Sequence, residues 1–504
     1  MADTRMLSFT HKSQAYPAKR NPADRAGDFQ EISPSFLLAK AEEQASRCSQ
    51  CGVPFCQVHC PLQNHIPDWL KLAAEGRLRE AYELSNSTST MPEICGRICP
   101  QDRLCEGNCV IEQSGHGSVT IGSVEKFITD TAWKEGWVEP LTPVADRSTQ
   151  SVGIIGAGPA GLTAAELLRV RGYDVHVYDR HDRAGGLLTY GIPGFKLEKP
   201  IVTRRVERLQ AGGIHFHLGV EIGGSGEGDL SFDTLRQRHQ AILIATGVYK
   251  PRPLGLDGSG HRGVVKALDY LIASNRKGFG DAVPAFDSGA LSAEGRNVVV
   301  IGGGDTAMDC VRTAVRQGAA SVTCMYRRDR ANMPGSAREV ANAEEEGVVF
   351  EWLAGPTAFT ADSEGHVRQV QAARMRLGLP DASGRRAPEP DPGQEFTLPA
   401  DLVIEALGFD PEDLQSAFQA PDLAVTRWGT VRAENQRLST SIPGVFAAGD
   451  IVRGASLVVW AIREGRDVAA AMHAWLKSEA AQQGAAAPLS GAVETGRSAE
   501  RELA

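Results

Sequence analysis

The feature that most constrains the fold of this chain is a pattern of strand, glycine loop and helix that occurs twice. In the first copy, the apolar run at residues 152–155 leads into Gly156, Gly158 and Gly161, and then into residues with helical apolar spacing. Glycines at these positions allow a tight turn, a close approach of the backbone to a pyrophosphate, and close packing of helix on strand. The N-terminus of the helix then faces the anion. One such motif predicts a phosphate site but does not say which dinucleotide is held.

The second copy lies at residues 297–309. An apolar strand leads into Gly302, Gly303 and Gly304, and Ala307 stands where the third glycine of the pattern would be. A chain of 504 residues has room for about three domains. We therefore expect an α/β fold that contains two Rossmann-like dinucleotide-binding domains.

The residues after the first loop favour FAD at that site. The strand at residues 174–179 ends in Asp179, at the distance from the glycines where an acid binds a ribose hydroxyl. The alternative is that this aspartate only caps a turn. A second glycine turn follows at Gly185 and Gly186, which suits a dinucleotide that extends beyond the adenosine end.

The residues after the second loop favour NADPH. The position equivalent to Asp179 is Met325, so the acid that would bind the 2′-hydroxyl of NAD is missing. Arg327 and Arg328 follow, and two guanidinium groups at this place suit a 2′-phosphate. The alternative is that the two arginines form a solvated strand end.

Eight of the ten cysteines lie between Cys48 and Cys109. In an intracellular protein such clustering indicates metal binding rather than disulfides. A cysteine followed by proline at the end of a four-cysteine run is typical of 4Fe-4S ferredoxins, and Cys60 is followed by Pro61. Two structural zinc sites are the alternative, but only Cys48 and Cys51 have the spacing that such sites favour. Apolar residues at helical spacing between the two runs predict a helical domain.

The cysteine segment, residues 48–125, resembles the two-cluster helical domain shared by the small (β) subunit of NADPH-dependent glutamate synthase and the N-terminal part of dihydropyrimidine dehydrogenase. The resemblance implies a first 4Fe-4S cluster on Cys48, Cys51, Cys56 and Cys109. It implies a second 4Fe-4S cluster on Cys60, Cys99, Cys105 and Glu125. In the dehydrogenase a glutamine occupies the position of Glu125, so this ligand is in question. Cys95 is the alternative fourth ligand, and a solvated Glu125 on a helix is the other interpretation.

The segments around residues 241–247 and 445–450 resemble two-dinucleotide flavoproteins. In that family the residue at the position of Asp450 binds the ribityl chain, and the following helix points its N-terminus at the flavin. Together the motifs predict an FAD site formed by Gly156, Gly158, Pro159, Ala160, Gly161, Asp179, Gly186, Leu187, Lys196, Gly449, Asp450, Leu457 and Val458. They predict an NADPH site formed by Gly302, Gly303, Gly304, Asp305, Thr306, Arg327, Arg328, Ala406 and Gly408.

From Cys48 to about Trp475 the chain resembles the glutamate synthase small subunit, including the motifs GGLLTYGIP and GGGDTAMD. The resemblance implies an oxidoreductase in which NADPH reduces FAD and electrons leave singly through the clusters, without a catalytic acid or base. A large (α) subunit carrying FMN and a glutaminase is the implied partner, because neither the N-terminal cysteine of a glutaminase nor an FMN barrel is found here. Two alternatives are the input subunit of a pyrimidine reductase or of a ferredoxin:NADP oxidoreductase complex, and a zinc-stabilised interaction subunit with vestigial dinucleotide folds.

Composition excludes some classes of partner. A net charge of -9 does not suit nucleic-acid binding, which needs a concentrated basic face. The sequence shows no signal peptide and no apolar segment that would span a membrane, so we expect a cytoplasmic protein.

The motifs divide the chain into predicted domains. We expect a helical iron-sulfur domain at residues 1–147, whose first 29 residues form a mobile arm. The FAD domain is predicted to be discontinuous, at residues 148–264 and 431–478, and the NADPH domain to occupy residues 265–430. The acidic stretch at residues 343–347 is predicted to be a solvated helix end, and residues 379–399 an exposed hairpin or loop. Residues 479–504 are predicted to be a disordered tail.

Overall fold

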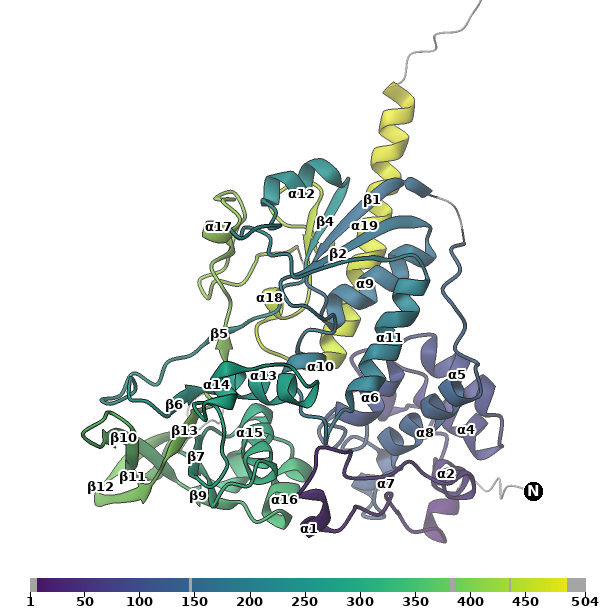
Figure 1. Ribbon diagram of the computed structural model, residues 1–504. Helices are drawn as coiled ribbons and strands as arrows, with labels where there is room; N and C mark the ends of the chain where they lie inside the picture. The colour runs from purple at the N-terminus through teal and green to yellow at the C-terminus, as the bar shows by residue number, and fades with distance from the viewer. Residues whose placement is uncertain (1–6, 145–146, 381–385, 435–436, 487–504) are drawn as a thin grey trace, which may run out of the picture.

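The computed structural model describes residues 7–144, 147–380, 386–434 and 437–486, and these residues form three packed bodies (Figure 1). A helical body lies at the lower right of Figure 1, a first sheet with its helices above it, and a second sheet with its helices at the lower left. The α/β architecture expected from the two glycine motifs is confirmed.

The first glycine loop belongs to a parallel sheet of five strands in the order β15-β4-β1-β2-β3. Helices α9, α11 and α19 cover one face, where their apolar residues pack against residues such as Ile154 and Leu243. The opposite face, which includes Ile155 and Ile244, packs against α12 and α17. The strands are β1 (Arg147–Ile155), β2 (Tyr173–Asp179), β3 (His215–Leu218), β4 (Ala241–Ile244) and β15 (Val445–Ala447). The helices are α9 (Pro159–Val170), α10 (Leu187–Tyr190), α11 (Lys199–Ala211), α12 (Phe232–Arg238), α17 (Leu414–Ala417), α18 (Asp450–Arg453) and α19 (Val458–Ala486).

The second glycine loop belongs to another parallel sheet of five strands, in the order β6-β13-β7-β8-β9. One face packs against α13 and α15, and the other packs against the three-stranded antiparallel sheet β10-β11-β12. The parallel strands are β6 (Val264–Lys266), β7 (Asn297–Ile301), β8 (Ser321–Tyr326), β9 (Val349–Trp352) and β13 (Leu402–Glu405). The helices are α13 (Ala267–Gly278), α14 (Pro284–Asp287), α15 (Asp305–Arg316) and α16 (Ala337–Glu345).

The segment predicted as an exposed hairpin or loop belongs to this antiparallel sheet. Its strands are β10 (Ala354–Ala361), β11 (Val367–Pro380) and β12 (Arg386–Pro399), and residues 381–385 lie outside the described residues. Residues of β12 are largely exposed. The hairpin therefore projects from the second sheet at the far left of Figure 1.

The chain crosses between the two sheets at a small ribbon formed by β5 (Lys250–Pro251) and β14 (Phe409–Asp410). Residues beyond the ribbon, including Leu414, Leu423 and Val431, already pack against the first sheet. The packing therefore changes nearer residues 250 and 410 than at the predicted boundaries of 264 and 430. The difference arises because segments without regular motifs, such as residues 411–430, give no sequence signal of the core they join.

The N-terminal body contains short helices that surround the cysteines, as the helical spacing predicted. Its larger helices are α2 (Leu38–Ala45), α4 (Ile66–Ala74), α5 (Leu78–Asn86), α6 (Pro92–Ile98) and α8 (Ile121–Lys134). Single turns η1 (Ser8–Thr10), α1 (Pro22–Arg25), α3 (Phe55–Val58) and α7 (Val110–Gln113) lie between or before them. Arg205 of α11 donates to the carboxylate of Glu93 on α6 at 2.8 and 2.9 Å, and this buried ion pair joins the body to the first sheet's helices.

The prediction that the first 29 residues form a mobile arm is wrong for residues 7–29, because these residues are packed against the rest of the protein. Arg25 is fully buried, and its Nε donates at 3.0 Å to Glu346. Glu346 belongs to the body built around the second sheet, which we call the second unit. Tyr16 donates its hydroxyl to Glu106 in the cysteine body at 2.7 Å. The arm therefore follows the junction between these two bodies, and its polar composition serves ion pairs that the sequence did not reveal. Residues 1–6 lie outside the described residues.

The C-terminus also departs from its prediction. Helix α19 continues to Ala486, past the predicted start of the tail at residue 479. Alanine, glutamine and glutamate are strong helix formers, so a helix already begun at Val458 continues through this stretch. Residues 487–504 lie outside the described residues. In the part of the chain that the structure describes, none of the helices combines the length and the apolar character that a membrane span requires.

Candidate functional site: nucleotide loops, cysteine cavities and the pocket between them

The first glycine loop has the geometry of a phosphate cradle. Gly156 has a φ of +109°, and a Cβ there would lie 2.3 Å from the carbonyl oxygen of Ala245. A Cβ on Gly161 would lie 2.0 Å from the carbonyl oxygen of Gly156, so helix α9 packs directly on the loop. A Cβ on Gly158 would meet nothing within 4 Å. Open space at the N-terminus of α9 is where a pyrophosphate would bind, so the loop fits a dinucleotide.

Asp179 lies beside this loop, at the end of β2. Its Oδ2 accepts a hydrogen bond from the amide of Ala157 at 2.7 Å, and its Oδ1 accepts one from the amide of His181 at 2.8 Å. The aspartate lines a cavity of about 110 Å³ together with Gly156, Thr246 and Tyr249. Asp179 therefore holds the loop and also faces a space that an adenosine could enter.

The C-terminal motif returns to the first loop. Gly449 has a φ of +83°, and its amide donates to Glu464 on α19 at 2.8 Å. Asp450 is half-buried, and its partial removal from water raises the pKa of its carboxyl group to about 6. Gly449 lies next to Ala160, because a Cβ on the glycine would be 3.1 Å from that side chain. The predicted FAD residues at 156–161 and 449–450 are thus brought together although they lie far apart in the sequence.

The second glycine loop also leaves open space for a phosphate group. A Cβ on Gly302 would lie 2.4 Å from the carbonyl oxygen of Ala406, whereas one on Gly304 would meet nothing within 4 Å. Arg327 and Arg328 follow β8, and neither side chain has an ion-pair partner among the residues described. The Nε atom of Arg328 is buried without a hydrogen-bond partner. Two unpaired guanidinium groups and an orphaned donor fit a bound phosphate group.

The cysteines converge on two small cavities. The first, of about 20 Å³, is lined by Cys48, Cys51, Cys56 and Cys109. Burial raises the pKa of Cys48 and of Cys56 to about 12, so these thiols hold their protons until a metal displaces them. Four thiols around one space are a donor set that suits an iron-sulfur cluster or zinc.

The second cavity, of about 30 Å³, is lined by Cys60, Cys95, Cys99, Cys105 and Glu125. Both predicted candidates for the fourth ligand, Glu125 and Cys95, therefore reach it. Glu125 is buried on α8, and burial raises the pKa of its carboxyl group to about 8. Its Oε1 accepts a hydrogen bond from Ser85 at 3.1 Å. The alternative interpretation, in which the Glu125 side chain is solvated, is therefore excluded.

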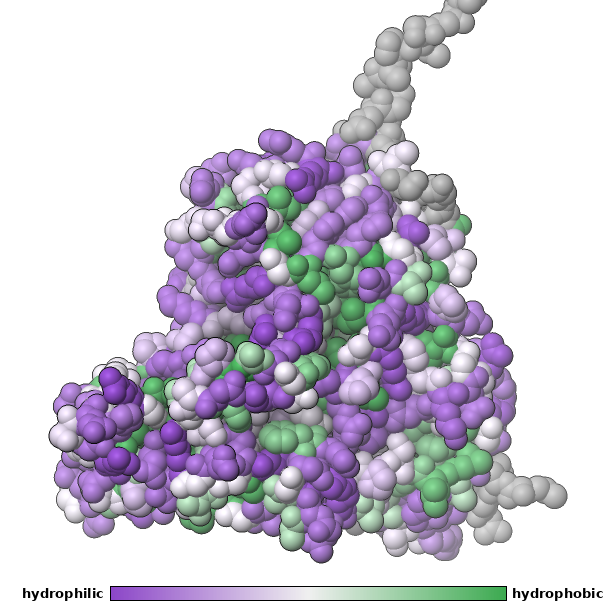
Figure 2. Space-filling view, viewed as in Figure 1, coloured by the Kyte–Doolittle hydropathy of each residue, from purple (hydrophilic) through white to green (hydrophobic). Residues whose placement is uncertain are grey.

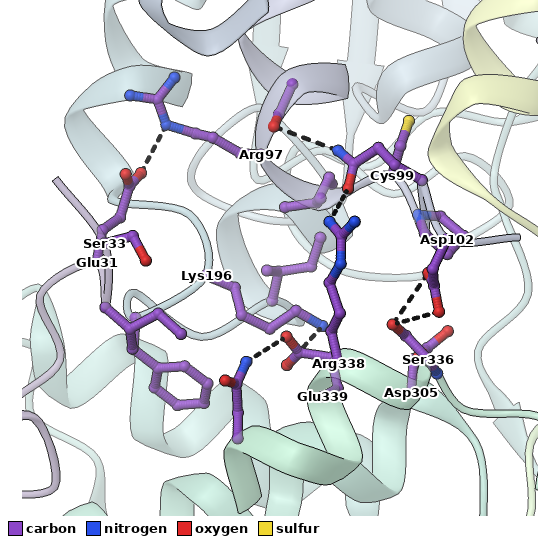
Figure 3. Close-up of a pocket in the computed structure, with 18 of the residues that line it drawn as sticks. Glu31, Ser33, Arg97, Cys99, Asp102, Lys196, Asp305, Ser336, Arg338 and Glu339 are labelled. Atoms are coloured by element: carbon purple, nitrogen blue, oxygen red, sulfur yellow. Dashed lines mark hydrogen bonds and ion pairs between the residues drawn. The ribbon is translucent and has the colours of Figure 1, made fainter. Parts of the chain in front are cut away.

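A cavity of about 500 Å³ lies where all three bodies meet (Figure 3). The body built around the first sheet, the first unit, contributes the loop at Ile192, Phe195 and Lys196 and the start of α19 at Leu457 and Val458. The second unit contributes Asp305, Thr306, Ser336, Arg338 and Glu339, and the cysteine body contributes Arg97, Cys99 and Asp102. Cys99 lines this pocket and also the second cysteine cavity. The pocket and the second cysteine cavity therefore adjoin at Cys99.

Charged side chains from two bodies meet in this pocket. Lys196, predicted to bind FAD, donates to Asp309 on α15 at 2.9 Å and lies 3.8 Å from Glu339 on α16. Burial raises the pKa of Asp309 to about 6, although Lys196 opposes the shift. Figure 3 shows Lys196 and Glu339 pointing toward one another across the cavity. The lysine thus links the first unit to the second.

Sequence reasoning missed the polar contacts that hold the pocket together. Arg338 contacts Glu106 and donates to the Tyr16 hydroxyl at 2.6 Å. Ser336 donates to Asp102 at 3.2 Å, a contact that Figure 3 also shows. Glu106 also accepts from the amide of Gly122 on α8 at 3.0 Å. No sequence motif marks these side chains, because their partners lie more than 80 residues away in the sequence. The bond between Glu106 and Gly122 is the exception, since it is local.

Fold and site together define a pyridine-nucleotide-dependent oxidoreductase joined to an iron-sulfur domain. Residues 25–137 match the family described as dihydropyrimidine dehydrogenase domain II, 4Fe-4S cluster, and residues 150–465 match the pyridine nucleotide-disulphide oxidoreductases. More narrowly, the chain belongs to the family of glutamate synthase [NADPH] small chains. It is 62% identical over 480 residues to that protein of Azospirillum brasilense, covering 95% of this chain and 98% of the relative.

The chain is also similar to other known proteins. The glutamate synthase [NADPH] small chain of Escherichia coli is 46% identical over 477 residues, covering 94% of this chain and 99% of the relative. The putative oxidoreductase AegA of the same organism is also 46% identical, over 481 residues that cover 94% of this chain and 72% of the relative. Among solved structures, FprA of Mycobacterium tuberculosis in complex with NADPH has a TM-score of 0.55 at 20% identity, covering 67% of this chain and 86% of that chain. This last likeness concerns the fold alone.

Proposed function

We propose that this chain is the electron-input subunit of an NADPH-dependent glutamate synthase. In this role it oxidises NADPH, and the electrons leave through iron-sulfur clusters to a large subunit that forms glutamate from glutamine and 2-oxoglutarate. The names of its relatives and its two matched families support the assignment. The large subunit would carry FMN and the glutaminase.

The observation that carries the proposal is the position of Cys99. This cysteine lines the 500 Å³ pocket between the two nucleotide units and also the second cysteine cavity. A pocket of this size at the junction of the two nucleotide units suits a flavin ring and a nicotinamide. An electron acceptor on the cysteines would then lie directly behind the pocket wall.

We propose that the residues around the first loop hold FAD and that those around the second hold NADPH, as the motifs predicted. When bound, FAD supplies the step from two-electron to one-electron chemistry. Gly158 leaves space for its pyrophosphate, and the N-terminus of α19 at Val458 faces the same pocket as Lys196. Arg327 and Arg328 would bind the 2′-phosphate of NADPH. We further propose two 4Fe-4S clusters, one in each cysteine cavity.

Exposed apolar side chains around the first cysteine cavity support a partner at this face. Val53, Phe55, Val58 and Val110 are between 39% and 62% exposed, and they flank the cysteines of that cavity. A separate hydrophobic area appears at the lower right of Figure 2, where Figure 1 places α2, the helix that begins at the exposed Leu38. Exposed apolar groups that gather around a redox centre favour a docked partner. We propose that the large subunit binds here.

Anaerobic purification and reconstitution test the proposal. We expect iron, sulfide and FAD to co-purify, and NADPH to be oxidised in the presence of an artificial electron acceptor. Addition of the large subunit should yield NADPH-dependent glutamate from glutamine and 2-oxoglutarate.

Two outcomes would overturn this assignment. If zinc is found in place of iron, the chain is not an electron carrier. If NADPH oxidation is coupled to pyrimidine or ferredoxin reduction and not to glutamate formation, the chain serves one of the other reductase complexes.

A further inference from the structure

Histidines gather at one edge of the first sheet, away from both nucleotide loops and from the cysteines. His176 on β2 is the register partner of His215 on β3, and β3 is the edge strand. Asp174 precedes His176 by two residues, so the two side chains lie on the same face of the sheet. The side chains of Asp174 and His176 are 31% and 22% exposed, and that of His215 is 57% exposed. Solvent therefore reaches all three.

The geometry of these three side chains fits a metal ion. Asp174 Oδ2 lies 3.1 Å from His176 Nε2, and Asp174 Oδ1 lies 3.4 Å from His215 Nε2. One ligand atom of each of the three residues lies within 4.8 Å of the other two. Tetrahedral zinc, with bonds of about 2.0 to 2.1 Å, separates neighbouring ligand atoms by about 3.3 Å. The three atoms need only small movements to surround an ion.

A second contact fixes the orientation of His176. Its Nδ1 lies 2.9 Å from Nε2 of His217, the next outward residue on β3. One of these two nitrogens must carry the proton of this hydrogen bond. If His176 Nδ1 donates, its Nε2 is left unprotonated and faces Asp174, as a metal ligand requires. Histidines that bind metals are commonly held in this way by a second hydrogen bond.

We propose that Asp174, His176 and His215 form a binding site for a divalent transition metal of the zinc class. Two imidazoles and one carboxylate favour Zn²⁺, Cu²⁺ or Ni²⁺ over Mg²⁺ and Ca²⁺, which prefer oxygen ligands. The exposed side leaves a coordination position for water. The ion would clamp edge strand β3 to β2, whose far end carries Asp179. This site shares no residue with the proposed cofactor sites.

Zinc titration of the anaerobically purified holoenzyme tests this site. The wild type is compared with His176→Gln and His215→Gln. His366→Gln is the matched control, because that exposed histidine also lies beside carboxylates, at 3.9 Å from Asp362 and Glu364. We expect one zinc equivalent that binds at least tenfold more weakly in the first two variants and with unchanged affinity in the control. The flavin content of each variant reports whether it has folded.

X-ray absorption at the zinc edge of the wild type gives a readout that does not depend on the variants. We expect nitrogen and oxygen neighbours at about 2.0 to 2.1 Å, because cysteine sulfur would appear at about 2.3 Å. Sulfur neighbours, equal affinities in wild type and His176→Gln, or no bound zinc would each overturn the proposal.

Discussion

At the scale of single residues, Arg327 and Arg328 carry the proposed choice between the two nicotinamide cofactors. We expect the double substitution Arg327→Ala with Arg328→Ala to weaken NADPH binding by about tenfold to a hundredfold and NADH binding much less, because charge-assisted hydrogen bonds to the phosphate are lost. Steady-state oxidation of both cofactors measures the preference. Arg330→Ala is the control, because this exposed arginine pairs with Glu344 instead. An unchanged preference for NADPH over NADH would show that other residues bind the 2′-phosphate.

Glu346 is a buried carboxylate that forms ion pairs with three arginines. It pairs with Arg25 at 3.0 Å, with Arg312 at 2.8 Å and with Arg316 at 2.7 Å. Removing one partner of a buried ion pair destabilises a protein by roughly 3–5 kcal/mol. We expect that loss for Glu346→Ala in urea unfolding. The exposed Glu344→Ala should cost less than about 1 kcal/mol.

The same carboxylate gives a pH dependence. Burial opposes its ionisation, but Arg312 and Arg316 prevail and lower the pKa of Glu346 to about 2. A carboxylate with a depressed folded pKa stabilises fully above its unfolded value, near 4.5, and this contribution disappears as the pH falls toward 2. Stability measured from pH 6 to pH 3 should therefore fall more steeply in the wild type than in Glu346→Gln. Parallel curves would show that this network does not govern the acid transition.

Glu125 and Cys95 compete for one place in the second cysteine cavity. Glu125→Ala should alter the electron paramagnetic resonance of only one reduced cluster if its carboxylate is a ligand. Cys95→Ala should then leave both signals unchanged. The reverse result would assign the ligand to Cys95, and two unaltered signals in both variants would exclude both residues.

At the scale of elements, two glycines of the first loop are expected to have different roles, Gly161 in folding and Gly158 in cofactor binding. Gly161→Ala puts a Cβ 2.0 Å from a backbone oxygen, which costs typically 1–3 kcal/mol or more. Gly158→Ala meets nothing within 4 Å, so it should preserve the fold while filling the space proposed for the pyrophosphate. We expect a lower melting temperature for the first variant and a lower FAD content at nearly normal stability for the second. Equal FAD retention in Gly158→Ala and wild type would contradict the cradle.

Elements also show what a sequence can predict. The strands and helices flanking the glycine loops were predicted correctly, because a local pattern of apolar residues and glycines defines them. The end of α16 was predicted to be solvated, yet Glu346 beyond it is buried. Its three arginine partners include Arg25, which is 321 positions away. No local pattern reports a contact of that separation, so neither the ordered arm nor the walls of the central pocket could be predicted.

At the scale of the whole molecule, the apolar side chains around the first cysteine cavity should decide assembly. We expect Val58→Asp to weaken capture of the large subunit by at least tenfold, because a charge would be buried in the contact. NADPH oxidation with an artificial acceptor should be unchanged. Leu379→Asp is the control, because this leucine is 92% exposed on the distant hairpin. Equal loss of capture in both variants would contradict a specific docking face.

Contacts between residues that lie far apart in the sequence also hold the molecule together. Strand β15 completes the first sheet beside β4, and the arm residue Arg25 reaches Glu346. During synthesis at about 5–20 residues per second, Arg25 must therefore wait about 20 to 60 seconds for its partner to emerge from the ribosome. Until then its guanidinium group remains in water, whereas the earlier part of the arm, at Tyr16, can already contact Glu106 of the cysteine body. The cysteine helices can thus fold and receive their metal before the arm closes over the junction.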